Sequence, residues 1–338
     1  MWNPLAPFNF QPDSPEGFIV AFLKSQWTAL PYPAADFTGQ TVIVTGSNVG
    51  LGLEAARHFV RLGVSKVIIA CRDPKKGEAA KRDIEGSTKR SGVVEVWLVD
   101  LGSYESVKQF CSKVATLDRL DVLVENAGIA TSYYAELEGM ESTVTVNVIS
   151  TFLIALLVLP KLRADALKYN LTPRLVIVSS QAHEQARFVE QDAPAILPAL
   201  KDPANQSDRY NVSKLLELLA IRELASAMSA SGKPQVILNT LSPGLCHSQL
   251  MRHAPFPLNI LAPIGKLFLA RTTEMGSRTL VFAASAEAET HGMYLQDCQI
   301  KEPSKWVTSK KGEEVQVKFY DELLETLEKI EPGITRNI

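Results

Sequence analysis

The chain has 338 residues, of which 46% are hydrophobic and 21% charged, and its formal net charge at pH 7 is −2. These values are ordinary for a globular protein with a sizeable core, and the small net charge gives no electrostatic reason to expect nucleic acid or an anionic membrane as a partner. The four cysteines are scattered without a CxxC pair, which argues against a metal site or a disulfide framework and favours a cytoplasmic protein with reduced thiols. An α/β chain of this length commonly forms a single domain.

Residues 1–38 are rich in proline and aromatic residues and show no clear period. We expect them to form an extension packed on the domain, with one short helix at about 15–26. Two apolar runs, 18–23 and 151–160, are too short to span a membrane, and we expect the second to be a buried helix. Weak peripheral contact with a membrane stays open.

The first strong pattern is a buried strand at 41–45, followed by a glycine-rich turn and an apolar-periodic helix to about residue 62. Glycine permits a tight turn and close approach of the backbone to a ligand, and a helix N-terminus presents free N–H groups to a pyrophosphate. A strand and a helix on either side of the turn strengthen this interpretation. The residues expected at the phosphates are Gly46, Ser47, Asn48, Gly50, Leu51 and Gly52.

The second strand, 66–70, ends shortly before Arg72 and Asp73. In a βαβ unit of this kind, the end of the second strand meets the adenosine ribose of a dinucleotide. An acidic side chain there would accept the 2′-hydroxyl, whereas Arg72 is placed to pair with a 2′-phosphate and favours NADP(H). Asp73 is an acidic side chain next to Arg72, so the pattern does not separate NADP(H) from NAD(H) fully. Arg72 could instead pair with Asp73 or Asp83.

A helix at 75–90 leads to a third strand at 93–99, which ends at Asp100 and Leu101. An aspartate at the carboxyl end of such a strand lies where the adenine of a dinucleotide would bind. Asp100 could also cap the helix that begins near Ser103, and both roles could hold together.

The fourth strand, 121–124, runs into Asn126, Ala127 and Gly128. Small residues at this point let the backbone approach a cofactor, and Asn126 can bond neighbouring strands. The alternation of strands and helices predicts a doubly wound, Rossmann-like parallel sheet of about seven strands, with helices on both faces.

Two further polar positions follow this unit. A helix expected at 140–165 carries Asn147 in an apolar stretch, which is unfavourable unless the amide is hydrogen-bonded. The strand 174–178 ends at Ser179 and Ser180, and ligands of such sheets bind at the carboxyl ends of the strands. We therefore expect these hydroxyls at the crevice.

Tyr210 and Lys214 open an apolar-periodic run, 215–221, and should lie on one face of a helix. A nearby ammonium favours phenolate and lowers the tyrosine pKa from about 10 towards neutrality, so the pair could transfer a proton. The alternative is two residues that merely share a solvated helix face.

Taken together, these residues resemble the short-chain dehydrogenase/reductase family. The motifs follow the family's order over about residues 38–300, and the stretches ACRDPKKGE (70–78) and GMYLQDC (292–298) are similar to its retinol-dehydrogenase-like branch and the fungal relatives of that branch, which usually prefer NADP. The motifs are the turn at 45–52, Asp100, Asn126 to Gly128, Asn147, Ser180, Tyr210, Lys214, and Ser242 to Gly244 after a strand at 235–241.

The resemblance implies a role for each of four side chains. Tyr210 would donate a proton to a carbonyl oxygen, or accept one from an alcohol, and Lys214 would lower the tyrosine pKa and bond the nicotinamide ribose. Ser180 would hold the substrate oxygen, and Asn147 would support a water that links Lys214 to solvent. The hydride would come from the nicotinamide.

The nicotinamide end of the cofactor would lie against backbone near Pro243 and Gly244. Ser248 stands where a threonine is commoner in the family, so it is the candidate for the hydroxyl contact that follows this turn.

The sequence departs from compact members of the family between Ser180 and Tyr210, where 181–209 is an insertion. It could wall the substrate pocket or form a surface excursion, and the residues do not decide between the two. His183, close after Ser180, is expected to line the substrate or to have no role, because the mechanism already has its acid.

The main domain is expected at 39–300, followed by a tail at 301–338 with a helix at about 312–330. Residues 245–272 are apolar and broken by prolines, and family members carry a substrate lid at this place. Such a composition favours a bulky apolar substrate, although a membrane-contacting patch is an alternative.

The sequence therefore predicts an NADP(H)-dependent oxidoreductase that reduces a ketone or aldehyde of a bulky apolar molecule, or oxidises the alcohol. The resemblance to fungal enzymes makes a polyketide or other secondary metabolite the first expectation. The alternatives are a retinoid- or sterol-type alcohol dehydrogenase, a dehydratase or isomerase, and a protein that senses NADP without turnover. Monomer and homodimer both stay open.

Overall fold

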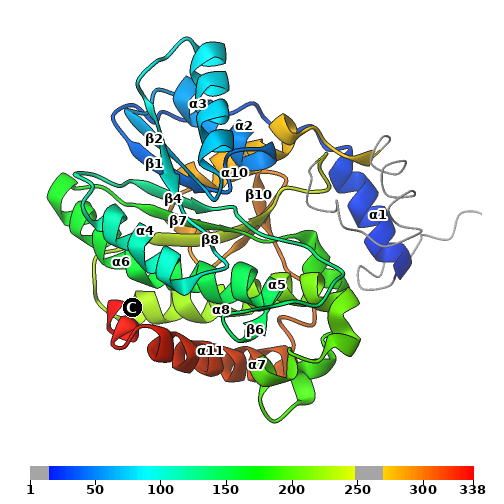
Figure 1. Cartoon of the computed structure of the whole chain (residues 1–338). Helices are drawn as coiled ribbons and strands as arrows, with labels where there is room; N and C mark the ends of the chain where they lie inside the picture. The colour runs from blue at the N-terminus through cyan, green and yellow to red at the C-terminus, as the bar shows by residue number, and fades with distance from the viewer. Residues whose placement is uncertain (1–14, 248–268) are drawn as a thin grey trace, which may run out of the picture.

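Short apolar runs rich in valine and isoleucine form a central sheet in the part of the chain that the computed structural model describes, residues 15–247 and 269–338 (Figure 1). Such continuous apolar runs are typical of parallel strands that are covered on both faces. The strands are β1 (Thr41–Thr45), β2 (Lys66–Cys71), β3 (Val94–Leu98), β4 (Val122–Glu125), β7 (Arg174–Val178), β8 (Ile237–Ser242), β9 (Tyr294–Gln296) and β10 (Gln299–Lys301), in the order β10-β9-β8-β7-β4-β1-β2-β3.

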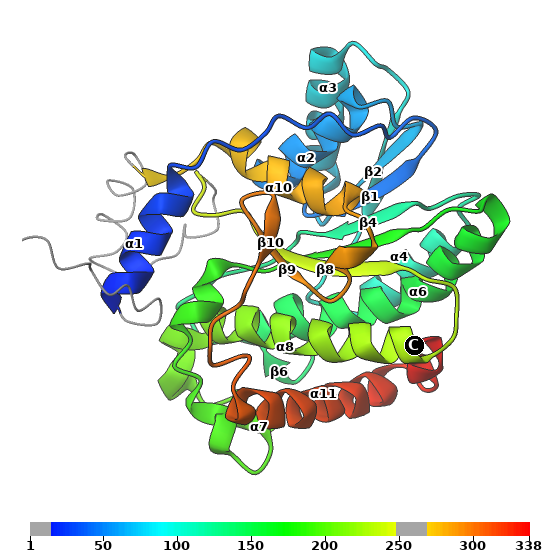
Figure 2. The same cartoon turned by 180° about the vertical axis from the view of Figure 1, so that it is seen from behind.

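Helices cover both faces of this sheet (Figures 1 and 2). Because side chains alternate along a strand, Val42 and Val44 of β1 pack on one face and Ile43 on the other. The first face is covered by α2 (Gly50–Arg61), α3 (Pro74–Thr88) and α10 (Thr273–Ser285), and the second by α4 (Tyr104–Ala115), α6 (Ser150–Tyr169) and α8 (Arg209–Ala230), with α11 (Lys310–Ile330) outside α8.

The predicted doubly wound α/β fold is confirmed. All the strands except β10 run parallel, in agreement with the expectation of about seven strands, and β10 is a short antiparallel edge strand that the sequence does not predict. The chain leaves β1 towards β2 and β3 on one side, and β4, β7 and β8 follow on the other. This reversal places the carboxyl ends of β1 and β4 at the point where ligands bind in such sheets.

The helix expected at 140–165 begins at Ser142, because residues 140–141 form β6 (Met140–Glu141) in a small hairpin with β5 (Glu136–Leu137). It comprises α5 (Ser142–Val144), a π-helical turn η1 (Thr145–Ile149) and α6. Within the described ranges, Ser142–Tyr169 is the one helical stretch long and apolar enough to cross a membrane, but 94% of its most apolar window is buried. It is therefore a core helix.

Helix α11 packs on the main core. α1 (Pro15–Gln26) has the bounds expected from the sequence, and α11 buries Phe319, Leu323 and Leu327 in the cluster that includes α8. The remaining short elements of the described residues are η6 (Ala288–Thr290) and η7 (Ile334–Asn337).

Part of the segment 181–209, which the sequence analysis expects to be an insertion, is buried in the core. Ile196 and Leu197 are buried in the main cluster, and their backbone N–H groups each donate to the Glu322 carboxylate of α11 at 2.8 Å. The segment therefore fastens α11 to the domain. Its elements are η2 (Gln181–Gln185), η3 (Val189–Asp192), α7 (Ile196–Ala199) and η4 (Pro203–Asp208).

Candidate active site

The glycine-rich turn after β1 packs closely against the segment that follows β4. A β-carbon at Gly46 would lie 2.8 Å from Cα of Ala127, and one at Gly52 would lie 2.6 Å from Nδ2 of Asn126. The Asn126 amide in turn donates to the carbonyl oxygen of Thr45 at 2.9 Å. Glycine is thus required for this close packing, and the expectation that Asn126 bonds a neighbouring strand is confirmed.

The N-terminus of α2 lies at this turn and carries no side-chain cap. Val49 occupies the N-cap position without a side-chain hydrogen bond to the first turn, and Gly50 has a left-handed backbone (φ +65°) with open space beside it. The first N–H groups of the helix are therefore left for an anion or for solvent. Ser47 donates to the Val44 carbonyl at 2.6 Å, Asn48 is half-buried, and Leu51 packs against α10.

Arg72 is exposed at the end of β2 and makes no hydrogen bond or ion pair with the described residues. The alternative that it pairs with Asp73 or Asp83 is not what the structure shows. Asp73 caps α3 through the N–H groups of the first turn, and Asp83 pairs with Arg57 at 2.6 Å. The Arg72 guanidinium is therefore free for an external anion.

Asp100 is half-buried after β3 and does not cap α4. Its Oδ1 accepts the N–H of Gly102 at 2.9 Å in a local turn, while the Ser103 hydroxyl caps the helix. The expectation that Asp100 could serve as the N-cap is thus wrong, because the serine that follows takes that position. Leu101 is buried, and its carbonyl accepts from the Ser150 hydroxyl at 2.6 Å.

Asn147 lies in the π-helical turn η1 and its amide is fully engaged. Oδ1 accepts the N–H of Ile129 at 2.8 Å, and Nδ2 donates to the Ile129 carbonyl at 2.9 Å and to the Ser213 hydroxyl at 3.0 Å. These bonds remove the penalty of a buried amide and fix the loop after β4 to α8. A β-carbon at Gly128 would lie 3.2 Å from Oδ1, so this loop also packs tightly.

Ser180, Tyr210 and Lys214 meet where β7 ends and α8 begins. Nζ of Lys214 lies 5.9 Å from the centroid of the Tyr210 ring, and the Ser180 side chain is close enough to the phenol to lower its pKa. Ser180 also accepts the N–H of Ala182 at 3.1 Å as the N-cap of η2. The structure therefore brings together the side chains that the sequence singled out for proton transfer.

The pKa of Tyr210 is raised above its ordinary value, so the expected fall towards neutrality is wrong for this arrangement. Burial of the phenol is the largest cause. The Lys214 ammonium and the nearby Ser180 side chain lower the pKa of Tyr210, as expected, but burial and the negative charge of Glu217 outweigh them.

Glu217 is a partner of Lys214 that was not expected from the sequence. Nζ donates to Oε1 of Glu217 at 2.7 Å and to the Val178 carbonyl at 2.9 Å. Burial raises the pKa of Glu217 to about 7, with Lys214 acting in the opposite direction. An acidic residue inside the apolar run 215–221, one helical turn from a lysine, is the signal that could have found it.

His183 has a structural position beside Ser180. Nδ1 donates to the Ser180 carbonyl at 2.8 Å, and Nε2 accepts the N–H of Ser304 at 3.3 Å. Burial lowers its pKa to about 4, as expected for a neutral ring with both nitrogens engaged. Neither nitrogen is left for acid–base chemistry.

The Pro243–Gly244 turn after β8 is held by α1, a contact that the sequence did not reveal. Gly244 has φ +78°, and a β-carbon there would lie 2.7 Å from Oε1 of Gln26. The Gln26 amide donates to the carbonyls of Leu245 (2.9 Å) and Leu269 (2.8 Å), and its oxygen accepts the N–H of Leu245 at 2.9 Å. Gln26 thus joins the described ends of the segment for which a lid is expected.

A buried ion pair supports the same turn. Arg271 pairs with Asp297 at 2.7 Å and donates to the carbonyls of Pro243 and Ser25. Ser248 and the greater part of the expected lid, residues 248–268, lie outside the described residues.

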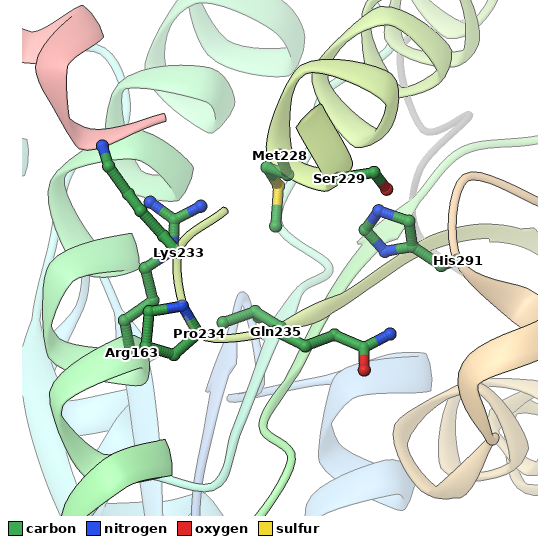
Figure 3. Close-up of a pocket in the computed structure, with 8 residues that line it drawn as sticks. Arg163, Met228, Ser229, Lys233, Pro234, Gln235 and His291 are labelled. Carbon is green, nitrogen blue, oxygen red and sulfur yellow. The ribbon is translucent and has the colours of Figure 1, made fainter. Parts of the chain in front are cut away.

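A cavity of about 240 Å³ lies at the other end of α8 from Tyr210 (Figure 3). Met228 lies 18 positions after Tyr210 in α8, which corresponds to about 27 Å along the helix. Arg163 and Lys233 donate to carbonyls near the C-terminus, and His291 bonds backbone through both ring nitrogens. This cavity is therefore not part of the Tyr210 site. It is lined by Arg163, Met228, Ser229, Lys233, Pro234, Gln235, Val236 and His291.

Two structures with the same fold carry bound nicotinamide dinucleotides. One is described as the NADH-dependent reductase A1-R′ complexed with NAD (TM-score 0.56, 19% identity, 77% of this chain and 95% of that chain). The other is a 3-oxoacyl (acyl-carrier-protein) reductase from Agrobacterium tumefaciens C58 with NADP bound (TM-score 0.56, 22% identity, 77% and 93%). At these identities the likeness shows the fold alone.

Other known proteins are more similar to this chain in sequence than these two structures are. The family model described as short chain dehydrogenase matches residues 40–191. The chain is 47% identical over 327 residues to the short chain dehydrogenase/reductase dmxR8 of Cryptosporiopsis sp. (strain 8999), covering 94% of this chain and 100% of the relative. It is 49% identical over 285 residues to the short chain dehydrogenase atnD of Emericella nidulans, covering 83% and 91%. The chain therefore belongs to the short-chain dehydrogenase/reductase family of oxidoreductases.

Proposed function

We propose that this protein is an NADP(H)-dependent enzyme that reduces a ketone or aldehyde of a bulky apolar molecule, or oxidises the corresponding alcohol. The observation that carries the proposal is that the Ser180 hydroxyl, the Tyr210 phenol and the Lys214 ammonium meet where β7 ends and α8 begins. Two hydroxyls at the carboxyl end of a central strand can bind one carbonyl oxygen together, and one of them can deliver a proton to it.

The residues at the carboxyl ends of β1 and β4, where the strand order reverses, fit a nicotinamide dinucleotide. Gly46 and Gly52 keep the turn compact, and the uncapped N-terminus of α2 offers N–H groups to a pyrophosphate. When bound, the cofactor supplies the hydride. The residues proposed to hold it are Gly46, Ser47, Asn48, Gly50, Leu51, Gly52, Arg72, Asp100, Leu101, Asn126, Ala127, Gly128, Tyr210, Lys214, Pro243, Gly244 and Ser248.

Arg72 supports NADP(H) over NAD(H). Its guanidinium is exposed and unpaired among the described residues, and a planar bidentate donor suits a phosphate group. The acid next to it in the sequence, Asp73, is turned to the first turn of α3, where Oδ1 accepts the N–H groups of Lys75 and Lys76.

The protonation state of Tyr210 supports the reductive direction. A phenol whose pKa lies above its ordinary value stays protonated near neutral pH, as a proton donor must. Ser180 would hold the carbonyl oxygen during the transfer. The phenolate left afterwards would be stabilised by the Lys214 ammonium, while Asn147 keeps the loop at Gly128 in place.

The substrate class rests on composition and on the relatives. The sequence that follows Gly244 is apolar and proline-broken, which suits a bulky apolar molecule. Both relatives described above come from fungi, so a polyketide or other secondary metabolite is the first candidate. The absence of a disulfide between the four cysteines, all of them in the described part of the chain, suits a reducing compartment such as the cytoplasm.

The proposal is tested by following NADPH absorbance with aromatic, polyketide and retinoid carbonyls. We expect NADPH consumption with at least one of the bulky carbonyls. Tyr210→Phe should lower kcat by about 10²- to 10⁴-fold while NADPH fluorescence still reports binding. Full turnover by Tyr210→Phe would refute the role of Tyr210. Substrate conversion without NADPH consumption would instead indicate a dehydratase or isomerase.

A further inference from the structure

Two buried glutamates lie with Lys214 behind Tyr210, and only one of them has an evident counterion. The exposed fractions are 5% for Lys214, 1% for Glu217 and 3% for Glu125. Lys214 reaches Oε1 of Glu217 at 2.7 Å. Oε2 of Glu217 and both carboxyl oxygens of Glu125 have no hydrogen-bond partner among the described residues.

The position of Glu125 in β4 explains why these groups meet. Leu123 packs on the sheet face covered by α4, α6 and α8, and Glu125, two residues further along the strand, points to the same face. In the pairing of β4 with β7, Glu125 stands opposite Ile177, next to the Val178 carbonyl that Lys214 contacts.

Three elements place titratable groups around this cluster. Burial is the largest cause that raises the pKa of Glu125 and of the Cys111 thiol on α4, and the charges of Glu217 on α8 and of Glu125, respectively, add to it. The Tyr210 phenol is the other titratable group, and the charge of Glu217 raises its pKa too. The Ser179 hydroxyl, which follows β7, donates a hydrogen bond to the backbone carbonyl of Lys214 beside this cluster.

Electrostatics allows only one of the two glutamates to be ionised. An isolated carboxylate is strongly disfavoured in a dry interior, and two carboxylates that share a site cannot both ionise near neutral pH. Glu217 has the ammonium as its counterion and is therefore the anion. Glu125 is then the acid, and its proton can satisfy the free Oε2 of Glu217.

We propose that Glu125 and Glu217 share one proton and act together as positioning residues that hold Lys214 against the end of β7 and weaken the field of its ammonium at Tyr210. The consequence for catalysis rests on the proposed function, whereas the shared proton does not. In this arrangement the cluster carries one positive and one negative charge. Glu217 opposes the effect of Lys214 on the phenol, which keeps Tyr210 protonated as a donor.

Two isosteric variants separate the roles of the two glutamates. Glu217→Gln removes the anion, so Lys214 acts unopposed and the tyrosine limb of the pH–rate profile should move down by about 1 pH unit. Glu125→Gln replaces a neutral acid by a neutral amide and should leave that limb in place. Glu223→Gln, the same change further along α8, is the matched control.

Infrared spectroscopy of the full-length protein tests the shared proton without turnover. At pH 7 to 8 the wild type should show the carbonyl band of a protonated carboxylic acid, which Glu125→Gln removes and Glu223→Gln keeps. Absence of the band in the wild type, or its survival in Glu125→Gln, would overturn the shared proton. Equal shifts of the pH–rate profile in Glu217→Gln and Glu125→Gln would overturn the assigned charges. If no carbonyl is turned over, the infrared result alone decides on the pair.

Discussion

The carboxylate of Glu217 lies 2.7 Å from the Lys214 ammonium, and both side chains are shielded from solvent. The lysine expected to activate Tyr210 therefore has a counterion inside the protein. Burial of the phenol is the main reason why the sequence motif alone gives the wrong direction for the tyrosine pKa, and the charge of Glu217, one turn beyond Lys214 on the helix, adds to it.

The buried carboxyls predict that stability falls as the pH rises. Burial raises the pKa of Glu125 well above its ordinary value, so the folded pair holds one proton that the unfolded chain releases above about pH 4.5. The contribution of this proton to stability is complete below that pH and is lost as the pH rises through the raised pKa of Glu125, at up to about 1.4 kcal/mol per pH unit.

Urea unfolding of wild type and Glu125→Gln between pH 5 and 8 measures this contribution. We expect the free energy of unfolding to fall less steeply in the variant. Parallel curves for the two proteins would show that Glu125 is ionised in the folded state.

The glycine turn yields a prediction based on close packing. In Gly52→Ala the new methyl would meet Nδ2 of Asn126 at 2.6 Å and the Gly46 carbonyl at 2.9 Å, so the turn must shift. We expect a loss of about 1–3 kcal/mol in stability and weaker NADPH binding. Gly86→Ala is the control: it lies in α3 with open space around its β-carbon and should stabilise the protein by about 0.5–1 kcal/mol. Unchanged NADPH affinity in Gly52→Ala would exclude the turn from the cofactor site.

Arg72 predicts the cofactor preference. Arg72→Ala should lower NADPH affinity roughly tenfold to hundredfold, the value of one charge-assisted contact, and leave NADH affinity nearly unchanged. Fluorescence titration with both cofactors measures the ratio. Arg82→Ala, an exposed arginine on α3, controls for general charge. Equal NADPH and NADH affinities in the wild type would refute the NADP assignment.

Gln26 predicts a role for α1 in the site. Gln26→Ala removes three hydrogen bonds to Leu245 and Leu269, and the backbone groups left unpaired should lower stability by about 1–3 kcal/mol. Because these bonds support the turn at Gly244, KM for NADPH should rise more than kcat falls. Lys24→Ala, exposed on the same helix, should change neither value. A variant that loses stability but keeps its KM would limit α1 to a structural role.

Local patterns made much of this structure predictable. Strand β1, strand β7 and helix α1 have the expected bounds, because short apolar runs with turn residues at their ends fix both type and length. The polar positions of the site could be found because hydroxyls and amides at strand ends stand out from apolar surroundings. Asn147 is an example, since a buried amide needs partners, and the structure supplies Ile129 and Ser213.

Contacts between distant segments were not predictable in the same way. Gln26 lies 219 residues from Leu245 in the sequence, and nothing in the composition of residues 1–38 indicates that pairing. The partner of Arg271 is Asp297 on the turn between β9 and β10, where a short edge strand was not foreseen. Such pairs depend on how the chain closes in space, and a single sequence carries no local signal for them.

His183 predicts the opposite pH dependence from the glutamates. Burial lowers its pKa from 6.5 to about 4, so the unfolded chain takes up a proton below pH 6.5 that the folded protein refuses. The stabilisation due to neutral His183 is therefore complete above pH 6.5 and is lost as the pH falls towards 4, by roughly 3 kcal/mol in total.

His183→Phe keeps the aromatic contact with Tyr294 but loses the bonds to Ser180 and Ser304. It should be less stable than the wild type at pH 7 by about 1–3 kcal/mol, yet lose less stability between pH 6.5 and 4. Urea unfolding across this range measures both differences, and equal losses in the two proteins would mean that His183 is protonated in the folded state and that its bond from Ser304 does not exist.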